Sequence, residues 1–262
     1  MAGRVNRWTV VGWACLLLPL LTMWHEIGGH AATCLALGGQ VTVLGAFYVH
    51  CEALAGARMV AVALAGVTAN LLLAALAYLG WRRAMRDQAR LALWYVWAGQ
   101  LMVASGYLLF SGASGYGDLG VGRGGVLADY GLGFGFRAAE LAVGAGAYFL
   151  AMRAAGRGLS AMIGTGSSTV ASRRRIALGY YLAVGAGAVL IGLLNPVGWT
   201  VLLLSAAASS FGGLAGLISI GFAEPAGDAA APFSVARNRP LVACGVVALL
   251  TFALVLGPSL RL

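Results

Sequence analysis

The sequence predicts an all-α polytopic membrane protein with about six to seven transmembrane helices and a short β-strand or hairpin after the first helix. Two features of the composition carry this prediction: 61% of the 262 residues are apolar and only 10% are charged. A soluble domain has roughly a quarter of its residues charged, so this chain must expose much of its surface to lipid. The third feature is a series of apolar runs that approach the about 20 residues needed to cross the hydrocarbon core. We expect one transmembrane domain over 1–262, with the motif-bearing core in 8–130 and further helices in 131–262.

Seven apolar runs are the candidates for these helices. They lie at 8–37, 58–80, 91–111, 130–152, 176–194, 199–222 and 240–257. Only about 8–24 of the first run is free of charged residues and histidines. The fourth run is the weakest candidate, because Arg137 and Glu140 lie in its first half. These two residues are three apart and could pair on one helix face.

The charge pattern predicts the orientation in the membrane. The net charge is +9 and every basic residue is an arginine. The arginines form short clusters between apolar runs, not one basic stripe with interleaved aromatics, so we expect the lipid bilayer and not nucleic acid as a partner. Alternate loops hold thirteen of them: Arg4, Arg7, Arg82, Arg83, Arg86, Arg90, Arg153, Arg157, Arg173, Arg174, Arg175, Arg237 and Arg239. The positive-inside rule then predicts an integral protein, of a bacterial cell membrane, with its N-terminus in the cytoplasm and its C-terminus outside.

Two connecting segments have a recognisable composition. After Gly38-Gly39, the stretch 41–50 is rich in β-branched and aromatic residues and too short to span as a helix, which predicts a strand or hairpin at the membrane surface. The stretch 155–172 is rich in glycine, serine and threonine, which predicts a flexible cytoplasmic linker.

The four cysteines contain no C-x-x-C pair. Three of them, Cys15, Cys34 and Cys244, lie in apolar runs, where a free buried thiol is expected. The cysteines therefore indicate no redox compartment.

Ionisable side chains at the end of the first apolar run indicate a functional site. His25, Glu26 and His30 follow one another within Trp24–Ala31. Ionisable groups at membrane depth are costly and are commonly functional. Imidazole nitrogens bind zinc, and a nearby carboxylate can deprotonate a metal-bound water.

The spacing of the two histidines allows two local structures. The usual H-E-x-x-H motif places its histidines four apart on one helix face, whereas His25 and His30 are five apart. In a regular helix this spacing separates them by roughly 140°, so that Glu26 and His30 would share a face and bind the metal. A π-bulge at Gly28-Gly29 would instead bring both histidines onto one face, and such bulges are frequent at functional sites. The glycines favour the π-bulge. A polar plug between helices that binds nothing is the remaining interpretation.

Two motifs resemble those of a known family. His25-Glu26-x-Gly-Gly-His30-Ala31, followed by Gly38-Gly39, resembles the H-E-x-G-H-A motif and the glycine-rich turn of the site-2 protease family of intramembrane zinc metalloproteases. The stretch Leu64–Ala74 is similar to the family's A-G-P-x-x-N-x-x-L-A helix, with Val67 in place of the proline. By this resemblance Asn70 would lie beside the metal and hydrogen-bond the substrate backbone or the developing oxyanion. Without it, Asn70 would be a polar contact between membrane helices. The motifs cover about 20–80, less than a third of the chain.

The third metal ligand departs from the family's usual pattern. That pattern supplies an aspartate shortly after an N-x-x-P sequence; Asn195-Pro196 is present, but the next aspartate is Asp228, in a loop on the expected cytoplasmic side. Asp118 lies in a glycine-rich segment similar to a G-D segment of more divergent relatives. The predicted topology also places this segment and the end of the first span on the same, extracytoplasmic side. His50 is the alternative ligand.

The resemblance implies a membrane-embedded zinc metalloprotease-like hydrolase. His25, His30 and Asp118 would hold Zn²⁺. Glu26 would take a proton from the attacking water, and Asn70 would position the substrate, a transmembrane segment of another membrane protein. Two other functions stay open: an inactive scaffold or pseudoprotease, which the histidine spacing and the missing proline favour, and a transporter that uses the same acids and histidines to carry ions or protons. The sequence predicts no particular oligomeric state.

Overall fold

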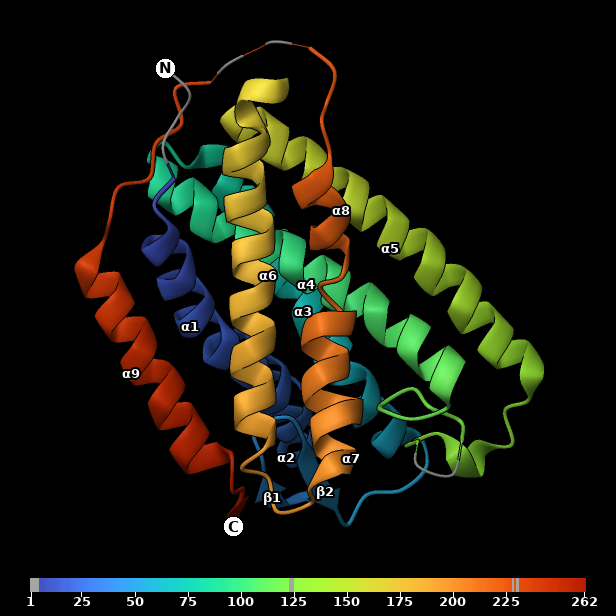
Figure 1. Ribbon diagram of the computed structural model, residues 1–262. Helices are drawn as coiled ribbons and strands as arrows, with labels where there is room; N and C mark the ends of the chain where they lie inside the picture. The colour runs from blue at the N-terminus through green and yellow to red at the C-terminus, as the bar shows by residue number, and fades with distance from the viewer. Residues whose placement is uncertain (1–4, 123–124, 228, 230) are drawn as a thin grey trace.

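The computed structural model describes residues 5–122, 125–227, 229 and 231–262, which excludes Arg4 and Asp228. The chain is mostly helical, and its helices run back and forth between two ends of an elongated bundle (Figure 1). Six helical segments in the described part are long and apolar enough to cross a membrane: Arg7–Ala36, Ala57–Arg83, Asp87–Ser114, Ser167–Gly192, Trp199–Phe222 and Arg239–Leu256. They coincide with six of the seven predicted spans and are compatible with an integral membrane protein.

The first segment is one continuous rod with an irregular middle. It consists of α1 (Arg7–Met23), the π-helix η1 (Trp24–Ala31) and α2 (Ala32–Ala36). The side-chain oxygen of Asn6 accepts hydrogen bonds from two main-chain N–H groups of the first turn, which caps the helix start. The π-helical turn confirms the irregular interpretation of the histidine motif. The regular helix is wrong, because Gly28 and Gly29 allow the wider turn that accommodates one extra residue.

Three long helices follow, packed side by side as α3 (Ala57–Arg83), α4 (Asp87–Ser114) and α5 (Phe134–Ile163). The last of these corresponds to the fourth predicted span. It is a helix of 30 residues, but charged residues interrupt its apolar stretch and it is not among the six segments above. It also corrects the predicted linker at 155–172, because α5 continues to Ile163. Only a short turn and the 3₁₀ helix η3 (Ser167–Thr169) precede the next helix.

Arg137 and Glu140 interact electrostatically, but no direct hydrogen bond or ion pair joins them among the described residues. The guanidinium of Arg137 donates instead to the main-chain oxygens of Gly112 (2.9 Å) and Ala113 (2.6 Å), at the end of α4. The last carbonyls of a helix have no partner within it and form the negative end of its dipole, so they attract a cation. The Glu140 carboxylate is buried and has no hydrogen-bond partner among the described residues.

The second half of the bundle contains α6 (Val170–Gly192), α7 (Trp199–Val201), a second π-helix η4 (Leu202–Gly212), α8 (Gly216–Phe222) and α9 (Arg239–Leu256). Buried aromatic residues join α4 to its neighbours. The Tyr95 ring stacks on Tyr180 of α6 at 4.0 Å between centroids, and the Trp94 indole N–H donates to the Ala155 oxygen of α5 at 3.0 Å. These contacts hold α5 and α6 against α4, the helix that leads into the Asp118 loop.

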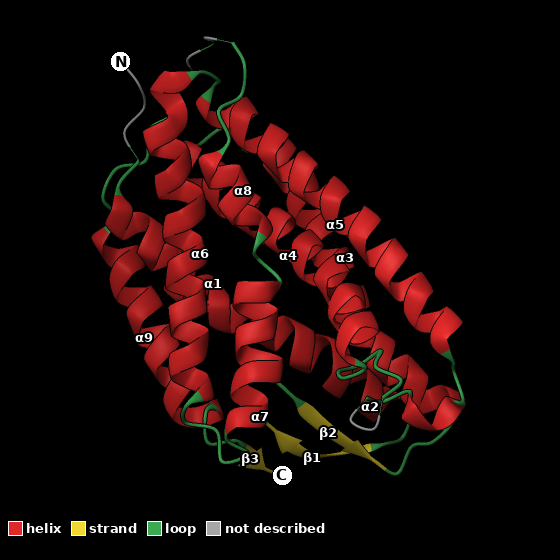
Figure 2. Cartoon of the chain, turned by 45° about the vertical axis from the view of Figure 1, so that its right-hand side comes forward, coloured by secondary structure: helices red, strands yellow, loops and turns green. Residues whose placement is uncertain are grey.

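A three-stranded sheet lies at one end of the helices (Figure 2). β1 (Gln40–Leu44) and β2 (Val49–Glu52) form an antiparallel hairpin, which confirms the predicted strand or hairpin. β3 (Leu260–Arg261) pairs with the other side of β1, a pairing that the sequence did not predict. The prediction that Cys34 is a free thiol is wrong: it forms a disulfide with Cys51 of β2, because the hairpin folds back over α2 and brings the two Cα atoms to 6.0 Å.

Candidate metal centre

Three of the predicted ligands meet at one point. His25 Nε2 and His30 Nε2 from η1 are 3.1 Å apart. Oδ2 of Asp118, from the loop after α4, lies 3.6 Å from His25 Nε2 and 3.2 Å from His30 Nε2. The π-helical turn explains this approach, because it places side chains five residues apart above one another.

These separations fit a tetrahedral zinc ion. Zinc bonds to imidazole nitrogen and carboxylate oxygen of about 2.0–2.2 Å place neighbouring ligand atoms roughly 3.3–3.5 Å apart. The three separations, from 3.1 to 3.6 Å, bracket that range. A set of three protein ligands also leaves a fourth position open, as catalytic zinc sites do. The donor set and its spacing therefore suit zinc.

The loop of Asp118 turns back toward the histidines at glycine positions. Gly115 ends α4 with a φ of 76° and Gly117 has a φ of 86°, a region that side chains other than glycine rarely adopt. Burial raises the pKa of the Asp118 carboxyl, but the charge on His30 and hydrogen bonds from both histidines outweigh it and hold the pKa well below its usual range. Asp118 is therefore a carboxylate, the form that binds a metal.

The two histidine rings are oriented in different ways. Nδ1 of His30 lies 2.7 Å from the Val62 main-chain oxygen, so its N–H points at α3 while Nε2 faces the centre, as is usual for a metal-bound histidine. Nδ1 of His25 has no hydrogen-bond partner among the described residues. Its ring is instead stacked against Tyr107 of α4, with centroids 5.0 Å apart and planes 13° apart. Tyr107 could not be recognised from the sequence, because nothing distinguishes one tyrosine in an apolar run from an ordinary residue of a membrane helix.

The second motif places a glycine against the histidines. A Cβ atom at Gly66 would lie 2.5 Å from Nε2 of both His25 and His30. A Cβ at Gly29 would lie 2.7 Å from the Gly66 Cα. The helices η1 and α3 are therefore in close contact at these two glycines. The indole N–H of Trp24 donates to the Ala69 oxygen at 2.8 Å and fixes the same pair of helices. The two sequence motifs are therefore two sides of one helix contact.

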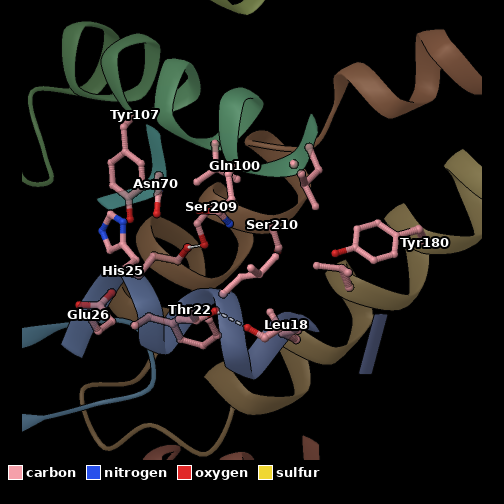
Figure 3. Close-up of a pocket in the computed structure, with 17 residues that line it drawn as sticks. Leu18, Thr22, His25, Glu26, Asn70, Gln100, Tyr107, Tyr180, Ser209 and Ser210 are labelled. Carbon is pink, nitrogen blue, oxygen red and sulfur yellow. Dashed lines mark hydrogen bonds between the residues drawn. The ribbon is translucent and has the colours of Figure 1, made fainter. Parts of the chain in front are cut away.

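The remaining predicted residues lie around this contact. Asn70 follows Gly66 by one helical turn, and Glu26 follows His25 directly; both are buried, with 1% and 4% of their surface exposed. Figure 3 shows Asn70, Glu26, His25 and Tyr107 along one wall of a cavity. The alternative ligand His50 does not join the three ligand atoms. It lies on β2, with its ring 5.2 Å from that of Tyr48.

Two cavities adjoin the centre. The larger, of about 690 Å³, is lined by His30 and Asp118, by β2 and by η4. The smaller, of about 70 Å³, extends into the bundle from His25. Glu26 and Tyr107 line both cavities, so the two meet at the candidate metal centre.

Comparison of the chain with protein-family models, curated proteins and solved structures gave no match.

Proposed function

We propose that this protein is a membrane-embedded zinc-dependent hydrolase that cleaves a peptide bond in or near a transmembrane segment of another protein. The observation that carries the proposal is the convergence of His25, His30 and Asp118 beside the buried carboxyl of Glu26. This centre lies among helices that are apolar enough to span a membrane. Transmembrane segments of other proteins in the same bilayer are therefore the substrates that can reach it. The resemblance of two motifs to those of site-2 proteases points to the same chemistry.

Each residue has a role that follows from its position. His25, His30 and Asp118 would hold zinc, which when bound polarises a carbonyl and favours deprotonation of water. A carboxylate oxygen of Glu26 accepts the proton of the attacking water and then delivers it to the leaving nitrogen. The amide of Asn70, which has an unpartnered oxygen among the described residues, hydrogen-bonds the substrate main chain.

The larger cavity is the proposed path of the substrate. Its volume of about 690 Å³ and its position between β2, α4 and η4 give room for an extended segment beside Asp118. β2 is an outer strand of the sheet, so one side of its main chain can pair with such a segment. The substrate helix must unwind around the peptide bond that is cleaved. The main-chain groups of the substrate that lose their helical hydrogen bonds can then pair with the free edge of β2.

We also propose that the N-terminus lies in the cytoplasm and the sheet outside. The arginine clusters lie in and beside the helix ends where α3 leads to α4, α5 to α6 and α8 to α9, and these helix ends lie at the N-terminal end of the bundle (Figure 1). The disulfide between Cys34 and Cys51 lies at the opposite end with the sheet. Disulfides persist in oxidising compartments, so the cysteines and the arginines support the same orientation.

Cleavage of natural membrane proteins tests the function directly. Purified zinc-loaded protein in detergent is incubated with a bacterial membrane-protein extract, and new peptide termini are identified by mass spectrometry. The wild type should create termini within hydrophobic segments. Glu26→Gln should retain zinc and create none, and Glu224→Gln, which changes an exposed carboxylate, should behave as the wild type. Zinc-loaded wild type that creates no termini would identify an inactive scaffold, and wild type that does not bind zinc would refute the metal centre itself.

A further inference from the structure

The smaller cavity continues from the metal centre into the interior of the bundle. Residues of α1, α3, α4, α6 and η4 surround it, and Figure 3 shows their side chains pointing into it. Much of its lining is polar although it lies among apolar helices. Besides His25, Glu26 and Tyr107 at the metal centre, the polar side chains are Thr22, Asn70, Gln100, Tyr180, Ser205, Ser209 and Ser210. A packed membrane bundle has no need of so many polar groups in one place.

The amide oxygens of two of these side chains lack partners. The oxygens of the Asn70 and Gln100 amides have no hydrogen-bond partner among the described residues, although Gln100 is only 4% exposed. A buried polar group without a partner costs about 1–3 kcal/mol. An amide carries both a donor and an acceptor, so whichever way it is turned it can bond a hydroxyl or another amide that enters the cavity.

Three hydroxyl groups of the lining are arranged differently. Those of Thr22, Ser209 and Ser210 donate within their own helices, to Leu18, Ser205 and Ala206, at 2.7, 2.7 and 2.5 Å. Each hydroxyl has one donor and two acceptor sites. Their donors are therefore used and their acceptor sites remain, so the cavity favours an occupant that donates hydrogen bonds.

The volume of the cavity and the charges of its lining restrict further which group can occupy it. The volume of about 70 Å³ is several times the 10–15 Å³ that one water molecule requires, and it suits a short side chain. The ionisable groups of the lining are His25 and Glu26, which the proposed reaction already uses, and the two tyrosines Tyr107 and Tyr180. Nothing else in the lining would balance the charge of a lysine or arginine, so the occupant is neutral.

We propose that this cavity is a specificity subsite for a short, neutral, hydrogen-bonding side chain of the substrate, that of serine, threonine or asparagine, next to the scissile bond. The proposal rests on the proposed function, because it requires a peptide in the larger cavity. Glu26 and Tyr107 line both cavities, so a peptide beside the metal ligands passes the mouth of the smaller one. A polar side chain of the substrate has no hydrogen-bond partners in lipid, but in this cavity it can hydrogen-bond to Asn70 and Gln100. The hydrogen bonds gained in the cavity favour cleavage of segments that carry such a side chain.

A pair of isosteric probes tests the subsite without a known substrate. Threonine hydroxamate and valine hydroxamate have the same shape, and both carry a zinc-binding group. Their affinities for zinc-loaded protein in detergent are measured by calorimetry. The two probes differ by one group that can form a hydrogen bond, the threonine hydroxyl. We therefore expect the wild type to bind the threonine probe about 5- to 150-fold more tightly than the valine probe. Gln100→Leu should reduce this preference to within about twofold, at unchanged zinc content.

Two further variants secure the result. Gln88→Leu makes the same change on α4 outside the cavity and should keep the wild-type preference. If Gln100→Leu does not fold, Ser210→Ala removes one acceptor of the cavity with a smaller change in volume and should lower the preference severalfold. Equal binding of both probes by the wild type would overturn the subsite, which then holds only water, and would leave the proposed function intact. A failure of both probes to bind zinc-loaded protein would overturn the open metal centre and the subsite with it.

Discussion

Replacement of Gly66 by alanine tests whether the two motifs form one metal centre. The new methyl carbon would lie 2.5 Å from Nε2 of His25 and of His30, against an ordinary contact of 3.4–4 Å. The rings must therefore withdraw by about 0.9 Å, whereas ligand distances in zinc sites are held to within about 0.2 Å. Helix α3 cannot retreat easily, because the indole N–H of Trp24 donates to the Ala69 oxygen at 2.8 Å and ties α3 to η1.

The displacement predicts a large loss of metal affinity. Changes to groups that only support the ligands weaken metal binding about 10- to 100-fold, and this change acts on two ligand atoms at once. We therefore expect Gly66→Ala to bind zinc at least about 100-fold more weakly than the wild type. Competition with a chromogenic chelator in detergent measures the affinity.

A matched glycine on the same helix provides the control. A Cβ at Gly80 would lie 3.5 Å from the nearest side-chain atom of Leu93, an ordinary contact. Gly80→Ala should therefore bind zinc as the wild type does. If Gly66→Ala also binds zinc within about threefold of the wild type, the histidine pair does not contact α3 as described and the reasoning is refuted.

Three other predictions follow from single contacts. Tyr107→Phe keeps the ring stacked on His25 and should leave zinc affinity within about threefold, whereas Tyr107→Leu should lower it about 10-fold or more, measured with the same chelator; equal losses would show that the hydroxyl matters and the stacking does not. Reduction of the disulfide between Cys34 and Cys51, which closes a loop with a sequence separation of 17, should destabilise the hairpin by about 3 kcal/mol, seen as faster proteolysis between these residues; an unchanged rate would contradict this. Arg137→Gln removes the charged donor from the end of α4 and should speed hydrogen exchange of the last turn of that helix, with no change as the contrary result.

The sequence predicted best those features that depend on neighbouring residues. The glycines at 28 and 29 and the five-residue spacing of His25 and His30 indicated the π-helical turn, and the β-branched stretch after Gly39 indicated the hairpin. Long apolar runs indicated six of the helices, because length and hydropathy are local properties. Asp118 was the exception, since it was chosen from a resemblance and from the expected side of the membrane.

Features that depend on distant contacts could not be predicted. The disulfide of Cys34 needs the hairpin to fold back over α2, and the pairing of β3 with β1 joins the C-terminal segment to a strand that follows the first helical segment. Arg137 was expected to pair with its neighbour on the helix, but the carbonyls at the end of α4 are the stronger attraction. Gln100 and Tyr107 lie in an apolar run like any other, and only the packing of five helical segments around them reveals a polar cavity.

X-ray absorption at the zinc edge is the most direct test of the central claim, that His25, His30 and Asp118 hold zinc. The account predicts one zinc per chain surrounded by nitrogen and oxygen at about 2.0–2.2 Å, with no sulfur at about 2.3 Å, and loss of this signal in Asp118→Ala. A protein purified in zinc that carries no stoichiometric metal, or a spectrum with sulfur ligands, would contradict it.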